Sequence, residues 1–317
     1  MNERLISFIE TSFLKPLLEI ETITDISYNG VSIFYMDNVL GRRKYKETIS
    51  PEQAIDFVRQ IANLSERQFS YTTPTLDFSI NRYRINAQHS SIVRVKDEKS
   101  VSFAIRIASN KNRIEDDPHF MDKEARKILL EAIAKKKSIV IAGSTGSGKT
   151  ELQKYLISHL EDCSRVIIID NVQELDYVRF NENLDVTSWQ ISPIIPQGNA
   201  QELIRNALRN NPDWIVVAES RGKEMADALN AVMSGHPIIT TLHARNVESI
   251  PHRILRLVQS GNKDEKAEEI LADIYEHLDY YVYLERVISK NKKVERYVSK
   301  IAMVDQNKEL KIIYERR

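Results

Sequence analysis

The sequence has little of several features that mark specialised protein classes. Its 317 residues include one cysteine, Cys163, nine glycines and nine prolines. A single thiol forms no internal disulfide and no multi-cysteine zinc site, so a disulfide scaffold is excluded and a reducing compartment is favoured. Lys plus Arg and Asp plus Glu each number 45, so the formal net charge is zero. Nucleic acid is therefore not indicated as a partner by overall charge.

Long hydrophobic runs are also missing. The longest apolar segments, Trp214–Ala218 and Tyr280–Leu284, have five residues, whereas a membrane-spanning helix needs about 20. The sequence therefore predicts no membrane span. Near the N-terminus, Glu3, Arg4 and Glu10 interrupt the apolar residues, which predicts an amphipathic helix packed on its own domain rather than a signal region.

The length and the pattern along the chain predict two domains. Residues 22–107 hold short strands, a hairpin turn at Asn29-Gly30 and a capped helix start at Ser50–Gln53, which predict a small α+β domain. The polar segment Asn110–Pro118 has no apolar periodicity and is typical of a linker. We place the boundary after residue 112, so that the predicted domains are residues 1–112 and 113–317.

After this linker, buried strands alternate with amphipathic helices. Because the strands are apolar on both faces, they need helices on both sides, which predicts an α/β fold with a mostly parallel, doubly wound sheet. Short strands are also expected at Tyr280–Leu284 and Leu310–Tyr314, in a C-terminal segment without a recognisable chemical motif. The main predicted strands are Ile139–Ala142, Val166–Ile169, Trp214–Ala218 and Ile238–Thr241, and the helices are Lys123–Ala134, Thr150–Leu160, Ala200–Asn210 and Lys223–Met233.

A glycine-rich segment between the first of these strands and the next helix matches the phosphate-binding P-loop pattern. Its glycines let backbone N–H groups turn inward around phosphate oxygens, and the helix N-terminus adds partial positive charge. Lys149 is expected to reach the β- and γ-phosphates, and the Thr150 hydroxyl to ligate Mg²⁺. The nucleotide-binding residues predicted here are Gly143, Ser144, Thr145, Gly146, Ser147, Gly148, Lys149 and Thr150.

Acidic residues follow two of the predicted parallel strands. Glu219 ends one strand, where a carboxylate suits a direct or water-mediated Mg²⁺ contact. Asp170, Asn171 and Glu174 follow another, where one carboxylate would orient and deprotonate the attacking water. These acids favour hydrolysis over phosphorylation of a substrate by a monomeric kinase.

Side chains with N–H donors complete the predicted site. His243 follows a third strand, where an imidazole N–H would donate to the γ-phosphate and report its loss. Arg84 and Arg106 lie in short strands of the first domain, and their planar sets of donors suit phosphate, although surface arginine is the commoner outcome.

Several segments in this order resemble the traffic ATPases of type II and type IV secretion and of type IV pili, most strongly their type IV secretion and tight-adherence pilus branch. Gly143–Thr150 resembles the Walker A segment, and Val166–Leu175 the acidic box. Leu208–Gly222 is similar to the Walker B region, and Ser234–Ala244 to the histidine box. The first domain resembles the family more weakly, around Arg84 and Arg106.

This resemblance implies a RecA-like P-loop domain that hydrolyses ATP with Mg²⁺. It also implies a hexameric ring, with ATP between the two domains and next to a neighbouring subunit, where Arg84 and Arg106 would close on the phosphates. The ring would lie in the cytoplasm, peripheral to the inner face of the bacterial cell membrane, and would serve a platform protein there in secretion, conjugative transfer or pilus assembly.

The resemblance also implies roles for single residues. Glu174 would be the general base, Glu219 the Mg²⁺ contact, His243 the phosphate sensor and Arg221 an interface or network residue. Asp170 would lie beside the nucleotide. The roles of Glu174 and Glu219 are open to exchange.

Two positions depart from the family pattern. Asp170-Asn171 stands where a Glu-Asp pair is usual, and Ala218 stands where glycine usually precedes the Walker B glutamate. Two alternatives to a hydrolysing motor for secretion therefore stay open: an assembly module that binds ATP with little turnover, and a nucleic-acid motor with a similar core.

Overall fold

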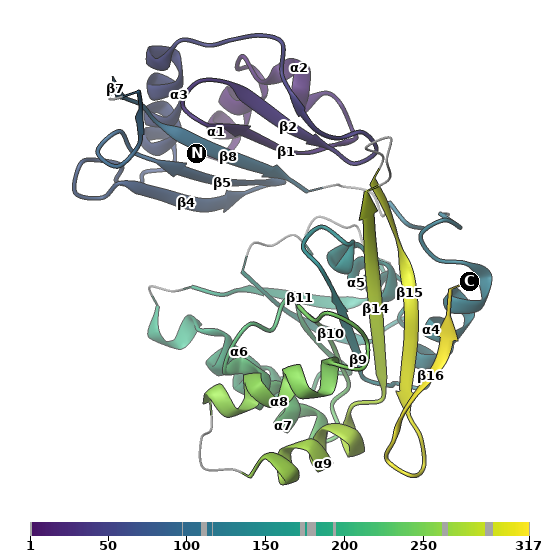
Figure 1. Ribbon diagram of the computed structural model, residues 1–317. Helices are drawn as coiled ribbons and strands as arrows, with labels where there is room; N and C mark the ends of the chain where they lie inside the picture. The colour runs from purple at the N-terminus through teal and green to yellow at the C-terminus, as the bar shows by residue number, and fades with distance from the viewer. Residues whose placement is uncertain are drawn as a thin grey trace. The chain divides into compact units, whose positions relative to one another are not determined.

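The chain divides into two compact units (Figure 1). The structure is a computed structural model and describes residues 2–96, 98–108, 113–115, 117–171, 175, 182–192, 195–261, 266–288 and 294–316. The first unit comprises Met1–Asn110 and Ile288–Val294, and the second comprises Lys111–Val287 and Glu295–Arg317. The predicted boundary after residue 112 lies outside the described residues, so the domain limits stay a prediction.

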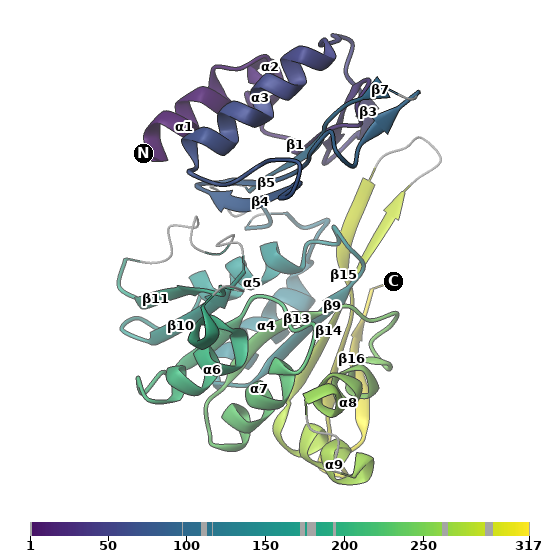
Figure 2. The ribbon, with the colours of Figure 1, turned by 90° about the vertical axis from the view of Figure 1, so that its left-hand side faces the viewer.

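The first unit is a six-stranded antiparallel sheet with helices on one face (Figure 2). The strands lie in the order β3-β2-β1-β8-β5-β4, and every second residue of β8 (Phe103, Ile105 and Ile107) is buried in the core. Its elements are α1 (Asn2–Glu10), α2 (Lys15–Leu18), α3 (Pro51–Leu64), β1 (Ile23–Tyr28), β2 (Ile33–Asp37), β3 (Gly41–Lys44), β4 (Thr75–Ile80), β5 (Tyr83–Gln88), the small β6 (Arg94–Val95) and β7 (Glu98–Lys99) pair, and β8 (Ser102–Ile107).

Local turn and cap chemistry explains two predicted features of this unit. Asn29 Oδ1 accepts the N–H groups of Val31 and Ser32, at 3.1 and 2.9 Å. Those donors close the turn, and β2 begins directly after it, at Ile33. Ser50 and Gln53 form a reciprocal capping box at the start of α3, as the sequence predicts.

The second unit contains an eight-stranded sheet in the order β11-β10-β12-β13-β9-β14-β15-β16. The strands from β11 to β14 are parallel, and β16 pairs antiparallel with β15. The mostly parallel α/β fold is therefore confirmed. The strands are β9 (Ile139–Gly143), β10 (Arg165–Asp170), β11 (Asp185–Gln190), β12 (Trp214–Val217), β13 (Ile238–Leu242), β14 (Tyr280–Ile288), β15 (Val294–Val304) and β16 (Leu310–Glu315).

Helices cover both faces of this sheet. Ile139 and Ile141 of β9 pack with α4 and α5, whereas Val140 and Ala142 pack in the core formed by α6 to α9. This alternation explains the continuous apolar runs of the strands, since both faces are buried. The helices are α4 (Lys123–Ala134), α5 (Lys149–Ser158), the 3₁₀ turn η1 (Pro196–Gly198), α6 (Ala200–Leu208), α7 (Glu224–Met233), α8 (Ile250–Gly261) and α9 (Ala267–His277).

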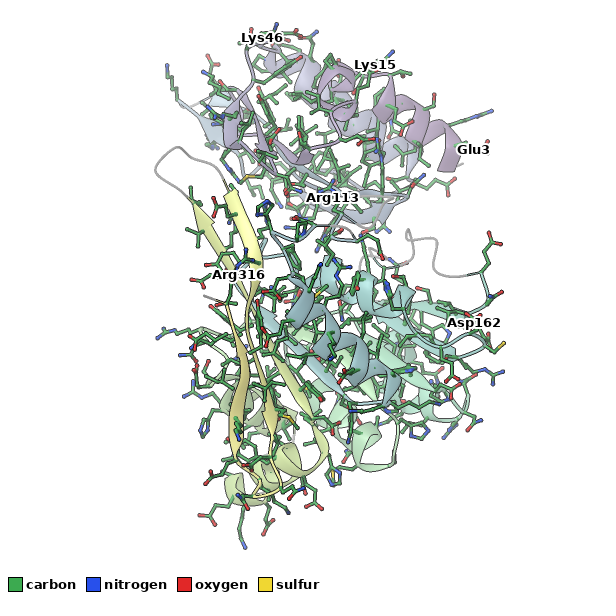
Figure 3. All side chains as sticks on the ribbon, turned by 90° about the vertical axis from the view of Figure 1, so that its right-hand side faces the viewer. Glu3, Lys15, Lys46, Arg113, Asp162 and Arg316 are labelled. Atoms are coloured by element: carbon green, nitrogen blue, oxygen red, sulfur yellow. The ribbon has the colours of Figure 1, made fainter. Side chains whose placement is uncertain are left out.

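Charged side chains lie mainly at the periphery of each unit. Glu3, Lys15, Lys46 and Asp162 are exposed, and their side chains point outward (Figure 3). The predicted amphipathic N-terminal helix is confirmed, because Leu5 and Ile9 of α1 are buried. Among the described helices, none combines the length and the apolar character that a membrane crossing requires.

Candidate functional site

The P-loop connects the buried strand β9 to the helix α5, in the strand–loop–helix context that its pattern requires. Two of its glycines are needed for steric reasons. A Cβ on Gly143 would lie 2.6 Å from both the Leu284 carbonyl oxygen and Ser147 Oγ. Gly148 has φ +99°, and a Cβ there would lie 2.7 Å from the Phe120 ring. Other residues would displace the loop, so the glycine spacing follows from the local packing.

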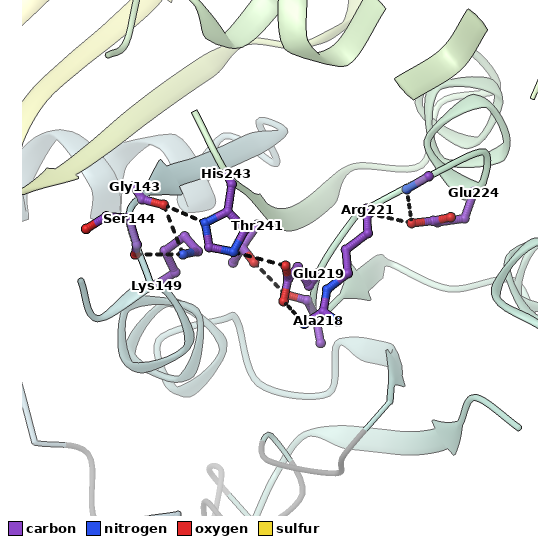
Figure 4. Close-up of polar contacts among 10 residues, drawn as sticks. Gly143, Ser144, Lys149, Ala218, Glu219, Arg221, Glu224, Thr241 and His243 are labelled. Carbon is purple, nitrogen blue, oxygen red and sulfur yellow. Dashed lines mark hydrogen bonds and ion pairs between the residues drawn. The ribbon is translucent and has the colours of Figure 1, made fainter. Parts of the chain in front are cut away.

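The Lys149 amine lies inside the P-loop. The residue is 8% exposed, and Nζ donates to the carbonyl oxygens of Gly143 and Ser144, at 3.1 and 3.0 Å (Figure 4). The Ser147 N–H also donates to the Ser144 carbonyl oxygen, at 3.2 Å. The loop is thus closed around an ammonium group, and a phosphate oxygen entering it would compete with two carbonyls for that cation.

Glu219 follows β12 and faces the P-loop side of the sheet edge (Figure 4). Its Oε2 accepts a hydrogen bond of 2.6 Å from Arg221 Nη2, and its Oε1 lies 3.3 Å from His243 Nε2. That second contact is within ion-pair range, but Oε1 is buried and accepts no hydrogen bond within the described residues. The carboxylate therefore retains acceptor capacity toward the site.

Opposing influences set the pKa of Glu219. Burial favours the neutral carboxyl, but the Arg221 hydrogen bond and the charges of Arg221, His243 and Lys149 outweigh it. The pKa is therefore lowered from its usual value. Glu219 is ionised at neutral pH, as a Mg²⁺ contact requires.

His243 connects the P-loop to Glu219. Its Nδ1 lies 3.1 Å from the Gly143 carbonyl oxygen. Because a carbonyl accepts and does not donate, Nδ1 carries the proton in this contact. The ring thus joins the end of β13 to the last residue of β9, while Nε2 faces the carboxylate of Glu219.

Neighbouring polar contacts hold the end of β12. Gln153 of α5, fully buried, donates from Nε2 to the carbonyl oxygens of Val217 (3.1 Å) and Ile239 (3.4 Å). Glu224 Oε1 accepts the backbone N–H groups of Arg221 and Gly222 and so caps the turn after Glu219. Helix α5 and this turn therefore fix where the carboxylate lies.

The acidic segment after β10 is described in part. Asp170 is buried, and its carboxylate accepts a hydrogen bond from the Leu175 N–H at 3.3 Å. Glu174, the predicted general base, lies outside the described residues. The nucleotide-side role of Asp170 and the basic role of Glu174 stay predictions.

Magnesium fits the donors that are present. No group of three or more His, Cys, Asp or Glu side chains in the described ranges would hold a metal ion by itself. Mg²⁺ in phosphate sites needs no such cage, since it binds one or two protein oxygens together with phosphates and water. The buried Oε1 of Glu219 and the half-buried Thr150 at the start of α5 supply oxygens of the required kind.

The two predicted arginines of the first unit face each other across strands β5 and β8, where Arg84 and Arg106 are register partners. Arg84 Nε lies 3.8 Å from Asp77, and Arg106 Nε lies 3.3 Å from Asp25. Both side chains are partly exposed on the sheet face that carries polar residues. Their contact with nucleotide stays a prediction.

Two further arginines contact the P-loop and were missed by the sequence analysis. Arg286 of β14 and Arg296 of β15 donate to the carbonyl oxygens of Thr145 and Gly146, at 3.5 and 2.6 Å. They follow the loop by 141 and 150 residues, in a segment without a motif. The order of strands in the sheet, which sequence periodicity does not reveal, places them there.

Comparison with known proteins gives consistent matches. A family model described as Type II/IV secretion system protein matches residues 79–300, more than half of the chain. An uncharacterized protein of Bacillus anthracis is 31% identical over 293 residues, which cover 88% of this chain and 64% of that protein. A type IV secretion system protein VirB11 of Bartonella quintana is 33% identical over 181 residues, 56% of this chain and 51% of its own length.

A solved structure supports the same fold. The ATPase DotB of Legionella pneumophila superposes with a TM-score of 0.68 at 23% sequence identity, covering 93% of this chain and 81% of its own. The expected resemblance to secretion ATPases of the type IV branch is confirmed by the family model and the relatives together. The chain belongs to the family of type II/IV secretion system proteins.

Proposed function

We propose that this chain is an ATP-hydrolysing motor subunit of a secretion, conjugation or pilus-assembly machine. The observation that carries the proposal is the convergence of Lys149, Glu219 and His243 at the P-loop, linked through the Gly143 carbonyl and the Glu219 carboxylate. An ammonium inside a glycine loop, beside an ionised carboxylate on a neighbouring strand, suits a Mg²⁺-bound nucleoside triphosphate.

The residues divide the work of hydrolysis. The P-loop N–H groups and Lys149 bind the phosphates, while Thr150 and Glu219 provide oxygens for Mg²⁺. When bound, Mg²⁺ neutralises charge on the β- and γ-phosphates. His243 is held by the Gly143 carbonyl oxygen and lies 3.3 Å from Glu219 Oε1, so it is placed between the P-loop and the end of β12. Glu174 is proposed as the base that takes the proton from the attacking water.

Motion and assembly form the wider part of this proposal. Residues 1–112 would form a domain that brings Arg84 and Arg106 to the phosphates on ATP binding and withdraws them after hydrolysis. Six subunits would form a ring in the cytoplasm, at the inner face of the cell membrane. The work would be delivered to a platform protein in that membrane. The family assignment and the VirB11 and DotB relatives support this picture.

A second candidate is an assembly module that binds ATP with little turnover. Asn171 favours it, because an amide replaces a charge near the phosphates. Ala218 favours it less. Its N–H donates to the Ile169 carbonyl oxygen in regular strand pairing, and its φ is not positive, so alanine fits where glycine is usual.

The test is phosphate release by the purified full chain with ATP and Mg²⁺, compared with Lys149→Ala. Measurable turnover in the wild type that is lost in Lys149→Ala supports the motor. Saturable ATP binding without turnover in the wild type supports the assembly module. Strong stimulation of turnover by single-stranded or duplex DNA would redirect the assignment to a nucleic-acid motor. Particle mass in solution with and without ATP and Mg²⁺ tests the ring, for which six copies are expected.

A further inference from the structure

Two strands, β14 and β15, contact carbonyl oxygens of the P-loop other than the two that Lys149 contacts. Arg296 Nε donates to the Gly146 carbonyl oxygen at 2.6 Å, and Arg286 Nη1 reaches the Thr145 carbonyl oxygen at 3.5 Å. Both carbonyls belong to the exposed tip of the loop, Ser144–Gly146. We propose that Arg286 and Arg296 are positioning residues for nucleotide binding, which hold the loop in the conformation that receives phosphate. This inference rests on the proposed function, because it concerns the same nucleotide.

The geometry of the peptide bond links these carbonyl contacts to the direction of the loop N–H groups. In a trans peptide group the C=O and the N–H point in opposite directions. Holding the Thr145 carbonyl on the outer side therefore directs the Gly146 N–H inward, and holding the Gly146 carbonyl directs the Ser147 N–H inward. The Ser147 N–H does point into the loop, because it donates to the Ser144 carbonyl oxygen at 3.2 Å. These inward N–H groups are the ones a P-loop uses for phosphate.

The loop needs such support because glycine makes it permissive. Gly146 has φ +74°, and Gly148 has φ +99°. A glycine-rich loop populates many backbone conformations, so fixing one costs conformational entropy at the moment of binding. The hydrogen bonds from Arg286 and Arg296 restrict the loop before nucleotide binds, so less conformational entropy is lost on binding.

The arginines also add charge at the right place. Three Arg286 side-chain atoms (Cδ, Nε and Cζ) would lie 3.9 Å from a Cβ at Gly146, so the guanidinium lies along the loop tip. Its Nε is buried and makes no hydrogen bond within the described residues. Arg286 thus places a cation with an unused buried donor beside the loop that Lys149 fills from within. A polyanionic ligand would gain from both cations.

The experiment compares Arg296→Ala, Arg286→Ala and Arg296→Lys with the wild type in the full chain. The matched control is Arg165→Ala. Arg165 also donates to a backbone carbonyl, that of Asn210 (3.1 Å), but it lies at the start of β10, at the sheet edge opposite the P-loop. Three readouts are taken: the Kd for ATP with Mg²⁺ by calorimetry, the KM and kcat of phosphate release, and the melting temperature without nucleotide.

We expect Arg296→Ala to weaken ATP binding about 10-fold, because a charge-assisted hydrogen bond is lost, and Arg286→Ala about 3-fold, because its contact is longer. KM should rise with Kd, while kcat at saturating ATP stays within about 3-fold. Arg296→Lys keeps the charge and a donor, so it should recover most of the affinity. Arg165→Ala should bind ATP within about 2-fold of the wild type.

The outcomes separate the two proposals. A wild type that binds no ATP overturns the proposed function. A wild type that binds ATP, with Arg296→Ala and Arg286→Ala binding equally well, overturns the positioning role alone. The positioning role is also overturned if each alanine variant loses ATP affinity only in proportion to its loss of melting temperature, and if Arg296→Lys restores neither the affinity nor the melting temperature. If Arg296→Ala does not fold, Arg286→Ala and Arg296→Lys decide by the same criteria.

Discussion

The inner and outer sides of the P-loop are built by different parts of the chain. On the inner side, Lys149 begins α5 directly after the loop that follows β9, and Glu219 and His243 follow β12 and β13 (Figure 4). These three strands are neighbours in the sheet, in the order β12-β13-β9. On the outer side, Arg286 and Arg296 come from β14 and β15, on the other side of β9. The inner side follows from a general rule on parallel strand ends. The outer side depends on which strands flank β9. The local motif therefore predicts the residues of the inner side and not those of the outer side.

The largest effect is expected from removing charge on the inner side. Glu219→Gln should lower turnover by about 10²- to 10³-fold, because the variant loses an ionised oxygen for Mg²⁺, while ATP binding stays within about 3-fold. Phosphate release and calorimetry measure the two quantities. Glu174→Gln should show the same loss of turnover.

Magnesium titration distinguishes these two acids. Glu219→Gln should need more Mg²⁺ for half-maximal turnover, whereas Glu174→Gln should need the same amount as the wild type. The opposite pattern would exchange their roles. Full turnover in Glu219→Gln would show that Glu219 is neither the Mg²⁺ contact nor the general base.

A second effect tests the steric fit of the loop. Gly148→Ala places a Cβ 2.7 Å from the Phe120 ring at φ +99°, whereas Gly235→Ala meets nothing within 4 Å at φ +91°. Backbone strain alone should cost Gly235→Ala about 1 kcal/mol, and the added clash should bring Gly148→Ala to about 2–3 kcal/mol. Melting temperatures with and without ATP report the difference. Equal losses of stability in the two variants would mean that the Phe120 ring moves aside and makes room for the new methyl group.

A third, smaller effect tests how the inner side is supported. Gln153→Leu removes the donor that the carbonyl oxygens of Val217 and Ile239 share. The loss should lower stability by about 1–2 kcal/mol and reduce turnover, because Glu219 directly follows that strand end. Gln190→Leu is the control, since Gln190 is exposed and the contact of its Nε2 with the Asn171 carbonyl oxygen is long, at 3.5 Å. Unchanged turnover in Gln153→Leu would show that the end of β12 does not depend on this amide.

The smallest effect concerns pH. Folding lowers the pKa of Glu219 from its usual value of 4.5. The ionised carboxylate therefore stabilises the fold at every pH above the pKa of the unfolded chain. That contribution is lost as the pH falls through the folded pKa, below about 4.5. The stability gap between the wild type and Glu219→Gln should therefore narrow on acidification through this range. A gap that stays constant in denaturation curves between pH 7 and 3 would contradict the lowered pKa.

Sequence reasoning recovered what depends on local pattern. The capping box at Ser50 and Gln53, the buried strand before Gly143 and the strand end that carries Glu219 are each encoded within a few neighbouring residues. Helices α8 and α9 and strand β11 were not predicted. β11 is a half-exposed strand with the sequence DVTSWQ, whose apolar signal is weak.

The rest depends on contacts between distant parts of the chain. No spacing in the sequence indicates that Arg296 would lie beside Gly146, because that contact follows from the order of β9, β14 and β15. The same holds for Gln153, whose partners on β12 and β13 lie 64 and 86 residues away. The P-loop residues that we propose to bind phosphate carry a motif, whereas Arg296 and Gln153, which we propose to position parts of the site, carry none.

The central claim is that the loop starting at Gly143 holds the phosphates of ATP around the Lys149 amine. Calorimetric titration of ATP with Mg²⁺ into the wild type and into Lys149→Ala tests it most directly. The account predicts saturable binding of one nucleotide per chain by the wild type and a loss of about 100-fold or more in affinity in Lys149→Ala. Equal affinity in the two proteins would contradict it.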